Sequence, residues 1–297
     1  MTGVILGISM TAALLGGIIK KYCGDRFENK AMMYHVYNAI VSIVSVIVLL
    51  VISDNLNLSA FTVGLGIVFG MVTALGQIFS LKAFEVGPFA YTCVIASLST
   101  IIPALSGHFI WKEQISSIQV VGMLLMVVCF VCSVDFSKRE EKKKPLSMWF
   151  VYTFLTFLCT GFVGVMQKWH QNTVHKTELD GFLVIAFTVS FLYSLGCFLL
   201  SSVKKPEERR IVLKKDLGTV TFLLIVLGGV CAAANNKLNL YLSGVMDSAV
   251  FFPVVNGGGL VLTTIASLAI FKERLSAQKW VGVMIGIVSV LLLCSSN

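Results

Sequence analysis

The chain has 297 residues, of which 57% are hydrophobic and only 13% are charged. Soluble proteins carry roughly 45–50% apolar and about 25% charged residues, and a soluble fold this poor in charge would expose large apolar patches. The composition excludes a soluble domain and predicts an integral, multi-pass protein, with the plasma membrane as the expected location. The net charge of +8 falls between the apolar stretches, so it indicates membrane topology rather than binding of nucleic acid.

Ten long stretches of the chain contain no Asp, Glu, Lys or Arg. They are 1–19, 31–53, 55–81, 86–111, 114–134, 145–167, 181–203, 217–236, 248–271 and 280–297. A helix needs about 20 apolar residues to cross a bilayer, and the short alternating segments of a membrane β-barrel are absent. The sequence therefore predicts an all-α integral membrane protein with ten transmembrane helices.

The second half of the chain repeats features of the first half. The turn Lys112–Ser116 matches Lys272–Ser276, and both follow the pattern Lys-Glu-x-[Ile/Leu]-Ser. A weaker echo places Lys168-Trp169, just after the sixth charge-free stretch, on Lys21-Tyr22, just after the first. The chain therefore divides into a first five-helix repeat at 1–137, a basic connecting loop at 138–146 and a second five-helix repeat at 147–297.

Five spans per repeat is an odd number, so the two copies have opposite orientations in the membrane. Inverted repeats are a transporter device, because they provide two related conformations that open to opposite sides of a site at the midplane.

With these features, the chain resembles the drug/metabolite transporter superfamily, in particular its EamA-like ten-helix branch. The resemblance rests on the two Lys-Glu turns and on the stretch Ala83–Pro88, which is similar to that family's connection between helices 3 and 4. It implies a central cavity lined by helices 1–4 and 6–9, with helices 5 and 10 at the periphery. It also implies that Glu113 and Glu273 are turn residues at the membrane edge and not ligands of a substrate.

Polar residues and helix breakers near the middle of a span are candidates for a substrate site. In helix 9, Pro253 and three glycines flank Asn256, which predicts a loosened helix that leaves room for a solute. In helix 4, Ser97 and Thr100 precede Pro103. We expect helices 4 and 9 to bend at Pro103 and Pro253 and to flank the site there, with Asn256, Gly257, Ser97 and Thr100 as candidate contacts. The alternative is tight helix packing through small residues.

Helix 8 ends with a second polar group formed by Asn235, Asn236 and Lys237. Lys237 aligns with Gln77 of helix 3 in the repeat, and these four residues complete the candidate site. One interpretation makes Lys237 a fixed positive charge for an anionic substrate. The other is a lysine that extends to the membrane interface from a helix end.

These patterns favour a secondary transporter that moves a small organic solute, such as a metabolite, an amino-acid-like compound or a drug, by alternating access. No nucleotide-binding loop is present, and no Asp or Glu lies within any predicted span. The alternatives are an intramembrane enzyme or a non-transporting scaffold. We expect no cofactor, no metal and no nucleic acid, and we expect a small-molecule solute and membrane lipids as partners, with a homodimer as a further possibility.

The orientation of the chain is a first testable prediction. The connections 1–2, 3–4, 5–6, 7–8 and 9–10 hold 19 of the 23 Lys and Arg residues. The positive-inside rule therefore places these connections in the cytoplasm and both termini outside. A reporter that works only outside the cytoplasm should be active when it is fused after Asn297. Activity of a strictly cytoplasmic reporter at the same position would reverse the assignment.

Overall fold

The computed structural model describes residues 2–24, 26–27, 30–53, 56, 58–86, 89–132, 146–262, 265–266 and 277–295. All regular elements in these ranges are helical. Most of the predicted basic connection and the whole of the turn that contains Glu273 lie outside the described residues.

Ten apolar helical stretches can be identified in the described chain. Six are long and apolar enough to cross a membrane, and four are shorter, at Ile95–Trp111, Ser117–Cys132, Ser248–Leu262 and Trp280–Cys294. Each of the ten predicted spans overlaps one of these stretches. The helices form because backbone groups in lipid have no water to bond and must satisfy one another within the chain.

The helices group into two compact units, which are described separately. Unit 1 comprises Met1–Met71 and Thr173–Tyr241, and unit 2 comprises Val72–Asn172 and Leu242–Asn297. The elements of unit 1 are α1 (Thr2–Gly24), α2 (Lys30–Ile52), η1 (Lys176–Glu178), α8 (Leu179–Lys204), α9 (Pro206–Ile211), η2 (Val212–Asp216) and most of α10 (Thr219–Val245). Those of unit 2 are α4 (Phe89–Leu98), α5 (Ile101–Trp111), α6 (Ser117–Cys132), α7 (Leu146–Gln171), α11 (Ser248–Pro253), η3 (Val254–Gly258) and α13 (Ala277–Ser295). Helix α3 (Ala60–Val86) contributes to both.

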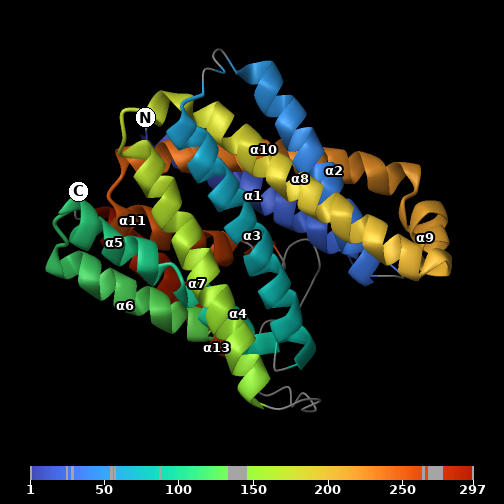
Figure 1. The fold of residues 1–297 in the computed structure, drawn as a ribbon. Coiled ribbons are helices and arrows are strands. Elements are labelled where there is room, and N and C mark those ends of the chain that lie inside the picture. Colours follow the sequence, from blue (N-terminus) through green and yellow to red (C-terminus); the bar gives the residue numbers. More distant parts are fainter. Residues whose placement is uncertain are drawn as a thin grey trace. The chain divides into compact units, whose positions relative to one another are not determined.

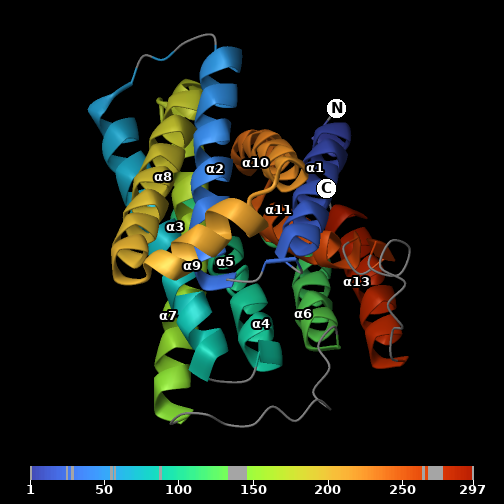
Figure 2. The same cartoon turned by 90° about the vertical axis from the view of Figure 1, so that its right-hand side faces the viewer.

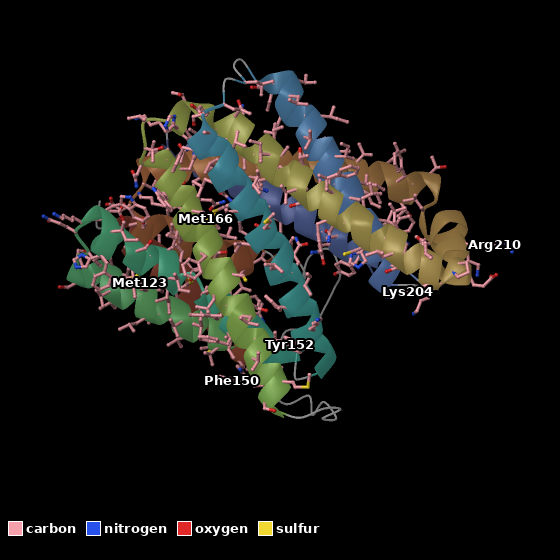
Figure 3. All side chains as sticks on the ribbon, viewed as in Figure 1. Met123, Phe150, Tyr152, Met166, Lys204 and Arg210 are labelled. Atoms are coloured by element: carbon pink, nitrogen blue, oxygen red, sulfur yellow. The ribbon has the colours of Figure 1, made fainter. Side chains whose placement is uncertain are left out.

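In unit 1, α2 packs most extensively against α8, and the two helices lie side by side in Figure 1. A buried apolar cluster joins the end of α1, the start of α2, η2 and α10. Its members are Ile19, Cys23, Phe27, Met32, Met33, Val36, Tyr37, Val212 and Ile225. Val212 of this cluster lies in the segment that connects α8 to α10. In the same region, Lys204 at the end of α8 and Arg210 in α9 are both exposed (Figure 3).

Two glycines bring helices of unit 1 into close contact. A Cβ added at Gly70 of α3 would lie 2.7 Å from the Val189 Cβ and 2.9 Å from the Ala186 carbonyl oxygen. A Cβ added at Gly229 of α10 would lie 2.7 Å from the Val44 Cβ and 3.1 Å from the Val41 carbonyl oxygen. In both places the glycine faces a valine and the backbone carbonyl of the residue three positions before that valine. Neither site therefore has room for a side chain.

In unit 2, α6 packs most extensively against α13, and Figure 2 shows them as neighbours. Small residues occupy this contact. The Ser289 hydroxyl donates a hydrogen bond to the Gly122 carbonyl at 2.7 Å, and a Cβ at Gly286 would lie 2.8 Å from the Cys129 sulfur. Gly122, near the start of α6, therefore meets the later part of α13, while Cys129 meets its middle, so the two helices run antiparallel.

The two close glycine contacts give a stability prediction. Gly70→Val and Gly229→Val should each lower the stability of the folded protein by roughly 1–3 kcal/mol, because the new side chain meets backbone as well as a packed valine. The measurement is the melting temperature and the monodisperse fraction in detergent. Gly64→Val is the matched control, because Gly64 lies on α3, as Gly70 does, but is exposed with nothing near its Cβ position. Equal melting temperatures for all three variants would contradict the packing argument.

Candidate functional site

The ninth apolar stretch is irregular at the place where the sequence predicts a loosened helix. Helix α11 ends at Pro253 and continues as the π-helical turn η3, which contains Asn256. Pro253 cannot donate a backbone hydrogen bond, and a run of three glycines begins at Gly257, so the tighter α-helical pattern is not maintained. Such turns are rare and often occur at functional sites. The Asn256 side chain is exposed, and its amide nitrogen donates to the Phe252 carbonyl at 2.9 Å.

The fourth apolar stretch is also broken, at Ser99–Thr100 rather than at Pro103, where the sequence predicts the bend. Helix α4 ends at Leu98 and α5 begins at Ile101. The Thr100 hydroxyl donates to the Ser97 carbonyl at 3.1 Å, within the break itself. The Thr100 hydroxyl therefore bonds to a backbone carbonyl of its own helical turn, as Ser and Thr hydroxyls commonly do in helices. Pro103 is tolerated as the third residue of α5, where its missing N–H would have no helical partner.

The two breaks pack against each other and against α7. Helix α11 packs mainly on α5, and α7 contacts both α4 and α5. A Cβ at Gly164 of α7 would lie 2.7 Å from Pro103 and 3.0 Å from Phe252, so this glycine faces both bends at once. Gly257 is buried against Met126 of α6, with no room for a Cβ. Of the two neighbours in η3, Asn256 is thus available to a solute and Gly257 is occupied by packing.

In unit 1, the polar residues of α10 separate onto two faces. Asn235 and Asn239 lie one turn apart and join Ser9 of α1, whose hydroxyl lies 3.0 Å from the Asn235 oxygen and 2.6 Å from the Asn239 oxygen. The Asn239 amide also donates to Asn235 at 3.2 Å. Ser9 is fully buried, so this is a polar cluster inside the helix bundle. The candidate residue Asn236 instead donates to the Ala232 carbonyl of its own helix at 2.9 Å.

Lys237 forms an ion pair that the sequence did not indicate. Its ammonium nitrogen lies 2.8 Å and 3.0 Å from the two carboxylate oxygens of Asp180, in the first turn of α8. The side chains are 30% and 17% exposed. The expectation that no carboxylate lies within a span is wrong here, because α8 begins at Leu179, before the charge-free run. An acidic residue in the first turn of a helix was the available signal. Gln77 is exposed on the part of α3 in unit 2.

A second buried ion pair lies at one end of unit 2. Glu113 follows the left-handed residue Lys112 after α5, and its carboxylate contacts the Lys168 ammonium at 2.6 Å. The same carboxylate accepts the backbone N–H of Ser248 at 2.7 Å. Glu113 therefore lies in a turn at a helix end, as the family resemblance implies. The sequence did not indicate its partner, because Lys168 lies 55 residues away on another helix.

Comparison with known proteins places this geometry in a family. The family model described as "Sugar transport protein" matches residues 7–296. The "Probable glucose uptake protein GlcU" of Bacillus cereus is 23% identical over 79% of this chain and 78% of its own length. The "Probable magnesium transporter NIPA1" of Arabidopsis thaliana is 24% identical over 69% of this chain and 62% of its own length. A crystal structure shares the fold, with a TM-score of 0.72 over 98% of this chain and 95% of its own, at 12% identity.

The apolar helices, the interrupted spans and these relatives together define an integral, multi-pass membrane transporter of the drug/metabolite transporter type, as the resemblance predicted. Within this class, the chain belongs to the family of sugar transport proteins. It is therefore a transporter and not an enzyme.

The Asp180–Lys237 contact gives a prediction that separates pairing from substrate binding. Lys237→Gln leaves Asp180 without its cation and should lower the melting temperature, whereas Asp180→Asn with Lys237→Gln should recover most of the loss. The measurement is a double-mutant cycle on thermal stability in detergent. Additive losses in the double variant would mean that the two groups are not coupled.

Proposed function

We propose that the protein is a secondary transporter that moves a small neutral, hydroxylated solute, such as a sugar, across the plasma membrane by alternating access. The observation that carries the proposal is the pair of interrupted helices in corresponding positions of the two halves, α4/α5 and α11/η3, which pack on one another. Interrupted spans at matching positions of a repeat are the strongest general pointer to a transporter's binding site.

The inverted repeat and the count of ten spans belong to this proposal, and packing supports them. Among the helix pairs given by the described residues, the most extensive are α2 with α8, α6 with α13 and α5 with α11. Each joins a span of the first half to the span five places later. A two-fold axis that exchanges the halves produces such pairs, because helices beside the axis meet their own counterparts. With five spans in each half, that axis lies in the membrane plane.

The glycine contacts of unit 1 support the same symmetry. The third span meets the seventh at Gly70, and the eighth meets the second at Gly229, which is the exchange that a two-fold axis makes. Around these glycines, Val41, Val44 and Ser45 of α2 correspond at a constant spacing to Ala186, Val189 and Ser190 of α8. We retain the division into 1–137, 138–146 and 147–297 on this basis.

The polar groups suggest the class of solute. Asn256 and the cluster of Ser9, Asn235 and Asn239 offer amides and hydroxyls, which both donate and accept hydrogen bonds, as sugar hydroxyls do. The ammonium of Lys237 is already paired with Asp180, which argues against a fixed charge for an anion. The family and GlcU are named for sugars and glucose.

Magnesium is the second candidate solute, because NIPA1 is named as a magnesium transporter. Mg²⁺ is usually bound through carboxylates together with retained waters. In the described chain, Glu113 and Asp180 are each engaged by a lysine. We therefore rank a neutral solute first, and we keep a homodimer as a prediction without further support.

The decisive experiment is transport by purified protein in liposomes, with labelled glucose, a panel of other hexoses and polyols, and Mg²⁺ as solutes. We expect uptake of at least one neutral hydroxylated solute and exchange of that solute across the membrane without a gradient. Transport of Mg²⁺ alone, or of no solute in the panel, would refute the proposal.

Asn256→Leu should reduce transport about tenfold or more, because a lost hydrogen bond of roughly 1.4 kcal/mol corresponds to a factor of ten in affinity, without lowering the amount of folded protein. Thr188→Leu is the matched control, because Thr188 is also exposed and also bonds the carbonyl four residues before it, but in the regular helix α8. Full transport by the Asn256 variant would remove this residue from the site. Equal loss in both variants would point to a general effect of leucine.

A further inference from the structure

We propose that Glu113 is a positioning residue for transport, because its carboxylate fixes the start of α11 and thereby places the π-helical turn that carries Asn256. The inference rests on the proposed function, which gives Asn256 a solute to contact. All the groups involved belong to unit 2, so the argument needs only the geometry inside that unit.

The carboxylate of Glu113 holds α11 by two routes. One oxygen accepts the Ser248 N–H, the first backbone donor of α11, at 2.7 Å. The other oxygen contacts the Lys168 ammonium at 2.6 Å, and this ammonium donates to the Met246 carbonyl at 2.8 Å. The Lys168 and Glu113 side chains are only 4% and 12% exposed. The chain is therefore held both at the first residue of α11 and two residues before it.

Glu113 caps the N-terminus of α11, where the residue before the helix provides no side-chain acceptor. The first N–H groups of a helix need acceptors, and the residue before the helix usually supplies one. Asp247 occupies that position with an extended backbone, but its side chain makes no capping hydrogen bond. A carboxylate from another helix provides the acceptor and the negative charge that a helix N-terminus favours.

Glu113 is itself held firmly at the end of α5. Lys112 adopts a left-handed conformation with φ 58°, and the Glu113 N–H donates to the Gly107 carbonyl at 3.1 Å. The Glu113 carbonyl lies 2.9 Å from the His108 ring nitrogen Nδ1. A Cβ at Gly107 would clash with the Glu113 carboxylate, so this glycine provides the space that the carboxylate occupies. The carboxylate thus connects α5 rigidly to α11.

A shift at Ser248 would reach Asn256 because the intervening chain is short and packed. Every residue from Ser248 to Val254 is buried, and the helical run continues to Leu262. Asn256 follows Ser248 by eight residues, a distance of about 12 Å along a helix. A closely packed segment of this length moves as one piece, so its starting point determines where Asn256 lies.

Exchanging the charges distinguishes a positioning role from a simple ion pair. In Glu113→Lys with Lys168→Glu, opposite charges still face each other, but the ammonium introduced after α5 cannot accept the Ser248 N–H and brings positive charge to a helix N-terminus. In Glu113→Gln with Lys168→Met, the ion pair is lost, but the amide oxygen still accepts that N–H. If the ion pair alone matters, the first double variant should keep the wild-type protection of α11 from exchange. If the carboxylate positions α11, the second double variant should keep that protection.

The experiment is hydrogen–deuterium exchange of the full-length protein in lipid nanodiscs, read at the amides of Phe251–Gly258. Glu113→Ala is the test variant, and the two double variants accompany it. Glu178→Ala is the matched control, because Glu178 also caps a helix from a distance: it accepts the Ser59 N–H at the start of α3, at 2.9 Å, in unit 1.

We expect exchange in Phe251–Gly258 to become about tenfold faster in Glu113→Ala and in the charge-exchanged variant, because the helix start is released. It should stay much closer to wild type in Glu113→Gln with Lys168→Met, which keeps the Ser248 contact and loses only the Met246 contact, and it should be unchanged in Glu178→Ala. Unchanged exchange in Glu113→Ala would overturn the inference, and so would full protection in the charge-exchanged variant. If Glu113→Ala does not fold, the two double variants decide the question by the same criterion.

Transport provides a second readout. With the solute identified, the charge-exchanged variant should show a KM raised about tenfold, because a small displacement of a contacting group is costly, while Glu113→Gln with Lys168→Met stays within about twofold of wild type. If the wild-type protein carries no neutral solute, the proposed function fails, but the exchange measurement still tests the position of α11.

Discussion

The absence of water in the lipid interior is the constraint on which this structure depends. Backbone N–H and C=O groups in a bilayer must bond within the chain, and irregular backbone is tolerated only where protein covers it or where it lines a watery space. The break before Ile101 and the π-helical turn at Val254–Gly258 violate the regular pattern at two places. Most of the backbone there is buried against α7 and α6, yet Asn256 is exposed. A polar side chain at such a place is costly unless it meets water or a solute, which is why we propose the site here.

Charge is handled by the same constraint. An isolated charge in a low-dielectric environment is expensive, whereas a paired and hydrogen-bonded charge is tolerated. Among the described residues, Glu113, Asp180 and Glu178 each contact a cationic or titratable partner, namely Lys168, Lys237 and His175. Two of these carboxylates also receive a backbone N–H at the start of another helix. They therefore join helices at their ends.

Local chemistry made part of this arrangement predictable from the sequence. The helix breakers around Asn256 and Pro103 act on their own turns of helix, so their effect is visible in adjacent residues. The duplicated Lys-Glu turns predict two related halves, and this stays a prediction. The partners of Glu113 and Lys237 were not predictable, because each lies on a different helix and is selected by packing. Asp180 was missed because counting charge-free residues places the start of a span after a carboxylate that the helix includes. Gly70 and Gly229 carried no signal alone, since a glycine's role depends on what faces it.

Helix α10 has a mechanical consequence for any transport cycle. Residues two apart on a helix point to opposite sides, so Asn235 and Asn239 engage Ser9 of α1 while Lys237 engages Asp180 of α8 on the other side. Turning α10 about its own axis would break a polar cluster and an ion pair together. Contacts on both sides of the helix therefore resist such a rotation, and they tie α1, α8 and α10 together within unit 1.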